Sequence, residues 1–329
     1  MINRFRWEET YEGEARIVDC LTDAVEIAAP DEINGRPVVE ICPRAFFNKR
    51  VRAVSFGANM RTIRSRAFSA SDLRVVAFTG EKLPEFDKNT FPCGSLRVVA
   101  SPDGTLEIPG RECVKLSLDQ LRSQTVDGCV LSADRKTLLC SIAPKLNRLP
   151  ASVEAIAPWA FSYDKTLQKI TISKKVQTID DAAFAGSLLR VAEFEGKVEN
   201  IADTAFENCT ALGVIASPDA SMAVPGAERL TTDALRSRTL DGVVFSADGK
   251  TLIACLESKK TYVVPPGVEI IRNRAFFASE IETIELPESL RQIDDFAFEK
   301  CASLRAVKLP AGCDVGKQAF AYCRNLKLM

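Results

Sequence analysis

The chain has no histidine among its 329 residues. This absence excludes Ser-His-Asp and Cys-His nucleophile systems, imidazole general bases and histidine-ligated metal sites. Phosphate-binding glycine loops, nucleophile elbows and calcium-binding EF-hand loops are missing as well. We therefore expect a protein that is not an enzyme and that uses no cofactor and no metal.

An excess of one charge and long apolar runs are also missing. The 43 Lys and Arg residues nearly cancel the 44 Asp and Glu residues, which leaves a net charge of −1. No stretch approaches the ~18 apolar residues that a bilayer-spanning helix needs. The sequence therefore predicts neither a nucleic-acid partner nor membrane insertion.

Targeting signals are lacking, and the cysteines favour a reducing compartment. The first residues contain no apolar signal-peptide core. The eleven cysteines are an odd number without a C-x-x-C pair, which favours thiols over disulfides. We expect a cytoplasmic protein by default, and a cell-surface or secreted one if this chain is a shortened form.

A short internal repeat runs along the chain. An aliphatic residue is followed four positions later by Ala-Phe, with one weaker Thr-Phe copy, and the anchor phenylalanines are spaced by 22, 23, 70, 23, 22, 70, 22 and 22 residues. Each interval of 70 is about three short periods, so a super-repeat of about 115 residues overlies the short one. The nine anchors are Phe46, Phe68, Phe91, Phe161, Phe184, Phe206, Phe276, Phe298 and Phe320.

One short unit predicts two extended segments and a turn. The first segment follows an L-x-x-I-x-L spacing that points alternate side chains inward, as in 73–78, 167–172, 281–286 and 304–309. A shorter one follows, as in 153–156, 176–179, 198–201 and 290–293. Ser, Asp or Asn then precedes Ala-Phe as a helix N-cap, which predicts a very short helix. Such coils bury their apolar edges by stacking.

The two long intervals repeat each other. Residues 96–103 match 212–219, and 127–139 match 241–253, with Asp-Gly pairs that predict tight turns. We interpret the intervals as irregular coils of one domain, residues 1–329, with super-repeats of about 1–101, 102–216 and 217–329. The C-terminal edge is predicted to be uncapped and open to end-to-end self-association.

These motifs resemble the BspA-like leucine-rich-repeat family. The pattern is clearest in Leu286-Pro287…Ile293…Ala297-Phe298…Cys301…Leu304. The resemblance covers essentially the whole chain. It implies an α/β, right-handed leucine-rich-repeat solenoid with a short strand and a short helical turn in each coil of about 22–23 residues, used for binding and often at the cell surface.

Two groups of residues suggest other chemistry. Cys209, Cys301 and Cys323 each follow an anchor by three residues, which suggests either a metal or redox cluster or a buried structural column. Asp180-Asp181 and Asp294-Asp295 suggest either paired carboxylates or helix caps. The repeat position favours the structural interpretation for both groups.

The outward positions of the longer strands form the candidate binding face. They are small or apolar with a few charges, which fits either a partner site or close cross-strand packing. We predict a non-catalytic scaffold that binds a protein partner along this face. The alternative is a bacterial cell-surface adhesin for a host matrix protein or glycan. The candidate residues are Val75, Val98, Lys169, Thr171, Val191, Glu193, Val214, Thr283, Glu285 and Lys308.

Overall fold

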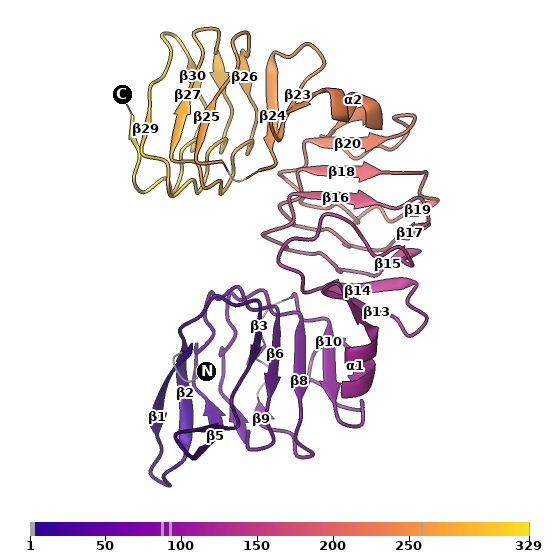
Figure 1. Cartoon of the computed structure of the whole chain (residues 1–329), viewed down its shortest axis with the longest axis vertical. Coiled ribbons are helices and arrows are strands. Elements are labelled where there is room, and N and C mark those ends of the chain that lie inside the picture. The colour runs from indigo at the N-terminus through magenta and orange to yellow at the C-terminus, as the bar shows by residue number, and fades with distance from the viewer. Residues whose placement is uncertain (1–3, 87–88, 92–93, 258, 329) are drawn as a thin grey trace. The chain divides into compact units, whose positions relative to one another are not determined.

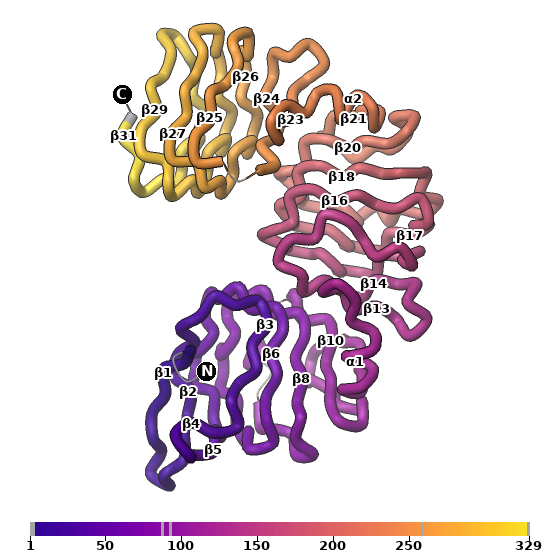
Figure 2. Tube along the Cα trace, viewed as in Figure 1, coloured from indigo at the N-terminus to yellow at the C-terminus, as the bar shows by residue number. Residues whose placement is uncertain are grey.

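The computed structural model describes residues 4–86, 89–91, 94–257 and 259–328. It is a β-solenoid in which strands of successive coils pair in parallel (Figures 1 and 2). The predicted solenoid is therefore confirmed. Two compact units are present. The first holds the residues up to Thr166 with 175–187 and 198–208, and the second holds 167–174, 188–197 and the residues from Cys209.

The first unit contains three sheets. The strands of the first sheet are, in spatial order, β1 (Phe5–Glu9), β2 (Ala15–Cys20), β5 (Arg36–Ile41), β7 (Thr62–Ile63) and β9 (Glu85–Phe86), with β4 (Glu32–Ile33) beside β5. Those of the second sheet are β11 (Val114–Ser117), β10 (Val98–Ser101), β8 (Val75–Phe78), β6 (Ala53–Phe56) and β3 (Glu26–Ala28). Those of the third sheet are β12 (Thr125–Val126), β13 (Cys129–Leu131), β14 (Thr137–Ser141), β15 (Ala155–Ile156), β17 (Thr178–Ile179) and β19 (Asn200–Ile201). Helix α1 (Leu118–Gln124) follows β11, with Ser117 and Gln120 forming a capping box.

The second unit repeats this plan with three further sheets. The first of them contains β16 (Lys169–Ile172), β18 (Val191–Phe194), β20 (Val214–Ser217) and β21 (Glu228–Thr231). The next contains β22 (Thr239–Leu240), β23 (Val243–Phe245), β24 (Thr251–Cys255), β26 (Ile270–Ile271), β28 (Gln292–Ile293) and β30 (Asp314–Val315). The last contains β25 (Thr261–Val263), β27 (Thr283–Glu285), β29 (Ala306–Val307) and β31 (Lys327–Leu328). Helix α2 (Thr232–Ser237) follows β21 and is capped by Thr231.

The predicted Asp-Gly turns are confirmed. Asp127-Gly128 joins β12 to β13, and Asp241-Gly242 joins β22 to β23, as two-residue antiparallel hairpins. Both residues of each pair have positive φ, at 51° and 71° in the first and 49° and 69° in the second. This is the conformation that two-residue hairpins require, and Asp-Gly adopts it readily.

The Ala-Phe segments form turns where short helices were expected, so that part of the prediction is wrong. In seven of the nine units the residue before Ala has a positive φ, as in Arg44 and Phe296, and residues two positions beyond Phe, such as Lys300, have one too. A right-handed helix cannot contain such residues. The backbone instead bonds to the next coil, since the Phe46 N–H donates to the Ala67 carbonyl at 2.9 Å.

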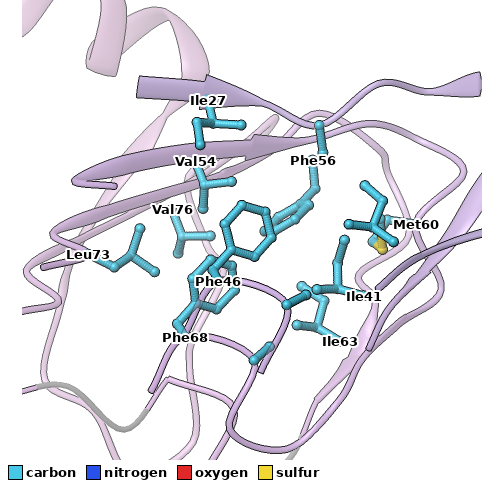
Figure 3. Close-up of a cluster of buried hydrophobic side chains, with 14 of the residues drawn as sticks. Ile27, Ile41, Phe46, Val54, Phe56, Met60, Ile63, Phe68, Leu73 and Val76 are labelled. Atoms are coloured by element: carbon cyan, nitrogen blue, oxygen red, sulfur yellow. The ribbon is translucent and has the colours of Figure 1, made fainter. Parts of the chain in front are cut away.

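The anchor phenylalanines stack from coil to coil. The ring centroids of Phe161 and Phe184 lie 5.0 Å apart, and those of Phe184 and Phe206 lie 4.9 Å apart, with interplanar angles of 5° and 2°. The other two triplets stack in the same way. Figure 3 shows the Phe46 and Phe68 rings one over the other among aliphatic side chains. Phenylalanine therefore recurs because each ring packs against the ring of the next coil.

A helix and a hairpin cover the outer face of the sheet β3–β6–β8–β10–β11. Val75, Val98 and Leu116 on that face form one buried cluster with Val130 of β13 and with Cys140 and Ile142 in and beside β14. Leu121 of α1 packs against the same cluster. The hairpin that opens one super-repeat therefore closes the sheet of the preceding one.

Buried arginines fasten this cover. The Arg52 guanidinium lies 2.7 Å from an Asp164 oxygen and 3.0 Å from an Asp72 oxygen, and the Arg74 guanidinium lies 3.1 Å from the other Asp164 oxygen. Arg74 also donates to the Ser141 carbonyl at 2.8 Å. Burial opposes ionisation of Asp164, but the two arginines outweigh it and lower the Asp164 pKa.

The second unit carries an equivalent cover with a different charge balance. Val191, Val214 and Leu230 pack against Leu235 of α2 and against residues of β23 and β24. Arg190 is buried and donates to the carbonyls of Cys255, Ala275 and Phe277. Burial lowers the Arg190 pKa to about 10, so the guanidinium remains charged at neutral pH.

Removal of the central ring of a phenylalanine stack should cost more than removal of an end ring. We expect Phe184→Ala to lower the free energy of unfolding by roughly 3–5 kcal/mol, because a cavity opens between two stacked rings. Phe320→Ala, at the half-buried end of its stack, is the control and should cost less. Urea unfolding followed by circular dichroism measures both, and equal losses would contradict the stacking argument.

Removal of the Asp164 charge should destabilise the first cover. Asp164→Asn leaves Arg52 and Arg74 buried with less counter-charge and should cost roughly 3–5 kcal/mol at neutral pH. Because folding lowers the Asp164 pKa, its contribution is present above the unfolded value and fades below about pH 4, so the gap to wild type should narrow on acidification. The control is Asp119→Asn, which removes an exposed ion pair between Asp119 and Arg122 within α1 and should not measurably lower the free energy of unfolding. A gap that stays constant with pH would contradict this assignment.

Candidate functional site

The candidate face is covered in two of the three places where the repeat builds it. Val75 and Val98 lie under α1 and the hairpin β13–β14, and Val191 and Val214 lie under α2 and the hairpin β23–β24. All four are at most 2% exposed. Their predicted exposure is therefore wrong, because the second and third super-repeats each place a hairpin on the sheet before them.

Charged candidates at the second sheet are only partly accessible. Glu193 is buried, and its carboxylate lies 2.9 Å from the Lys169 ammonium and 3.7 Å from the Arg236 guanidinium. Lys169 and Thr171 are half-buried. Lys169, Glu193 and Arg236 therefore form an ion-pair group beside the second cover.

The sheet β25–β27–β29–β31 carries the same face without a cover among the described residues. Thr283, Glu285 and Lys308 are exposed, and so is Val263, at 60%. Figure 2 shows β25, β27 and β29 side by side in the last coils. We call the outer side of these strands, with Val263, Thr283, Glu285, Ala306 and Lys308, the open face.

An ion-pair network borders the open face. Glu282 lies 3.2 Å from the Lys260 ammonium and 3.0 Å from the Arg305 guanidinium. Lys260 and Arg305 are mostly exposed, so water screens both pairs and each contributes little to stability. This border is exposed to solvent, whereas Arg52, Arg74 and Arg190 beside the two covered faces are buried.

A groove of about 600 Å³ lies elsewhere in the first unit, beside Trp159. Leu106, Ile108, Val114 and Leu139 are among its lining residues. The Arg97 guanidinium lies over the Trp159 ring at 5.4 Å from the centroid, and Trp159 is 46% exposed. The groove is not evident from the sequence, because Arg97 and Trp159 lie 62 residues apart in the chain.

The other suggested chemistry has structural explanations. The Cys301 and Cys323 thiols donate to the Phe276 and Phe298 carbonyls at 2.9 and 3.0 Å, in neighbouring coils. The ten cysteines within the described residues are thiols, and Cys93 lies outside those residues. No group of three potential metal ligands occurs among the residues that the structure describes.

The paired aspartates link coils. Asp181 accepts a hydrogen bond from the Thr204 hydroxyl at 3.0 Å, and Asp294 accepts one from the Asn273 N–H at 3.3 Å. Both bonds run between neighbouring coils. The helix-cap interpretation is therefore wrong, since these turns are not helical, but the structural role inferred from the repeat position is retained.

The sequence signal for the covers was present but ambiguous. Apolar outward columns at Val75 and Val98 fit a covered surface as well as a partner site. Arg74 and Arg190 occupy equivalent positions in two super-repeats. Only the folded structure shows that both are buried and hold the covering hairpin in place. Functional interest therefore moves to the face without a cover.

Comparisons with known proteins agree with this architecture. The family profile described as "BspA type Leucine rich repeat region (6 copies)" matches residues 31–126, 140–224 and 254–329, more than half of the chain. Comparison with curated proteins gives no significant match. In the described residues, no helix is long and apolar enough to cross a membrane.

Three solved structures similar to this chain come from bacteria. A leucine-rich cell surface protein from Faecalibacterium prausnitzii is 19% identical, with 100% of this chain and 93% of that chain covered and a TM-score of 0.26. A leucine-rich-repeat protein from Eubacterium ventriosum is 17% identical over 97% and 92%, with a TM-score of 0.28. The pneumococcal vaccine antigen PcpA is 16% identical over 96% and 76%, with a TM-score of 0.26. On its stacked coils and on the family profile, this chain belongs to the BspA-type leucine-rich-repeat family.

Proposed function

We propose that the chain is a non-catalytic scaffold that binds a protein partner on the open face. The observation that carries the proposal is the contrast between three equivalent sheets. Two of them bury Val75, Val98, Val191 and Val214 under a helix and a hairpin, and the third presents Thr283, Glu285 and Lys308 to solvent. The same backbone that receives a packed hairpin twice is therefore available for a third contact.

The open face suits a protein partner better than a small molecule. It is the outer side of a sheet, and it combines an exposed apolar side chain, Val263, with exposed charges of both signs. Binding would not require ordering of the strands, because they already pair in parallel. Preformed surfaces of this kind gain affinity by avoiding an ordering cost.

The groove beside Trp159 favours a second candidate function. A stacked, half-exposed indole in a groove of this size can hold a small ligand or one chain of a larger one. This feature would serve the adhesin alternative, with a host matrix protein or glycan as ligand. The adhesin function requires the cell surface, whereas the odd cysteine number favours a reducing compartment. The cysteine content therefore argues against the adhesin alternative.

Charge reversal on the open face should remove the partner. A photo-crosslinking amino acid at Thr283 is expected to form one discrete adduct in native cells. Glu285→Lys with Lys308→Glu keeps the net charge and reverses both local charges, so the adduct should fall at least tenfold. The adduct is measured by mass spectrometry.

The control double variant is Glu199→Lys with Lys145→Glu, two exposed residues on other coils. It should leave the adduct unchanged, and circular dichroism should show both double variants folded. Equal adduct yield in all three chains would remove the open face from consideration as the binding surface.

A further inference from the structure

Backbone hydrogen bonds align the three super-repeats residue by residue. The N–H groups of Arg74, Arg190 and Arg305 donate to the carbonyls of Arg52, Gln168 and Glu282 at 2.8, 2.8 and 3.0 Å. Arg305 and Glu282 beside the open face therefore hold the places that Arg74 and Arg52 hold under the first cover. The arginine at this position is buried in the first two super-repeats, as Arg74 and Arg190, and exposed in the third, as Arg305.

The N-terminal hairpin β1–β2 is the third member of the covering series. β2 pairs in parallel with β5 through Ile17 and Ile41, as β14 pairs with β15 through Leu138 and Ile156 and as β24 pairs with β26 through Leu252 and Ile271. Arg6 and Asp19 face each other across β1 and β2, at the positions that Val130 and Cys140 occupy in β13 and β14. In the described chain this hairpin covers no sheet, and Arg6 and Leu21 beside it are exposed.

The ion pair of the first cover has a counterpart with reversed charges. Asp164 follows the anchor Phe161 by three residues and donates its N–H to the Phe161 carbonyl at 3.1 Å, and Lys49 stands in the same relation to Phe46, at 3.4 Å. Under the first cover, Asp164 lies 2.7 Å from Arg52. The equivalent residues are Lys49 and Glu282, so the same geometry would pair a lysine with a glutamate.

We propose that the open face binds the β1–β2 hairpin and the first Ala-Phe turn of a second copy of this chain, with Lys49 of one copy against Glu282 of the other. This inference rests on the proposed function, because it names the partner of the same face. Two observations support it. The contact already occurs twice within the chain, and the charges that replace its central ion pair are complementary.

The composition of the two surfaces indicates reversible association. The internal covers bury valines and leucines, whereas the contact between copies would join Arg6 and Asp19 to Glu285, Lys308 and Lys327. Charged contacts gain less from burial and are weakened by salt. A head-to-tail contact uses two different surfaces, so it extends into open chains of copies unless its rotation closes a ring.

Sedimentation velocity over a range of protein concentrations tests the proposal on the full chain. We expect wild type to form species larger than a monomer at about 20 mM salt and to dissociate at about 500 mM. Lys49→Glu would place two glutamates together and Glu282→Lys two lysines, so each variant should weaken association at least tenfold. The control variants Lys145→Glu and Glu199→Lys should associate as wild type does.

Charge exchange gives the decisive readout. An equimolar mixture of Lys49→Glu and Glu282→Lys restores opposite charges at every contact between unlike chains, and the double variant restores them in one chain. Both samples should regain association, which a merely structural role of these residues would not predict. Persistent monomers in both samples would overturn the proposal.

The outcome is distinguishable from failure of the proposed function. Wild type that stays monomeric at high concentration and low salt would overturn association between copies. A discrete adduct with a different protein at Thr283 would then still support the scaffold function. An adduct between two copies, with peptides around Lys49 joined to peptides around Thr283, would support both.

Discussion

The fold depends on one constraint: a coil of about 22 residues cannot bury its own apolar edge, so each coil is stable only against its neighbours. Two ladders meet this constraint. One is the column of stacked phenylalanine rings, with centroids 4.7–5.5 Å apart within each triplet. The other is the row of hydrogen bonds from the N–H groups of five anchors to the Ala carbonyl one coil further on, namely Phe46, Phe161, Phe184, Phe276 and Phe298. Side chain and backbone therefore fix the same register.

The super-repeat solves a second problem, since a stack of short coils leaves the outer face of its sheet bare. The chain meets it locally, with a short capped helix and a hairpin that belong to the next super-repeat. The apolar residues on those strands serve this packing. Apolar residues that suggest a partner site in the sequence are therefore buried within the folded chain.

The sequence alone predicted the features that depend on local spacing. The anchor period predicted the stacks, the L-x-x-I-x-L pattern predicted the inward side chains of β8 and β16, and the Asp-Gly pairs predicted the hairpins. The turn at Ala-Phe was missed because an Asp before Ala-Phe looks like a helix cap. What decides against a helix is the positive φ of Ala182 and its counterparts, which the bonds to the next coil impose. The covers were missed because they join residues some 40–65 positions apart, such as Val75 and Cys140.

Arg190 is held by main-chain oxygens of Cys255, Ala275 and Phe277 and needs no particular side chain opposite it. The second super-repeat offers equivalent oxygens to Arg74, which donates to the carbonyls of Ser141 and Ala160. A duplicated, deleted or exchanged block of about 115 residues would therefore find a ready-made joint on either side. Arg52 is different, because its guanidinium pairs with the Asp164 carboxylate of the following block, so an exchange at that joint would need a matching acidic residue.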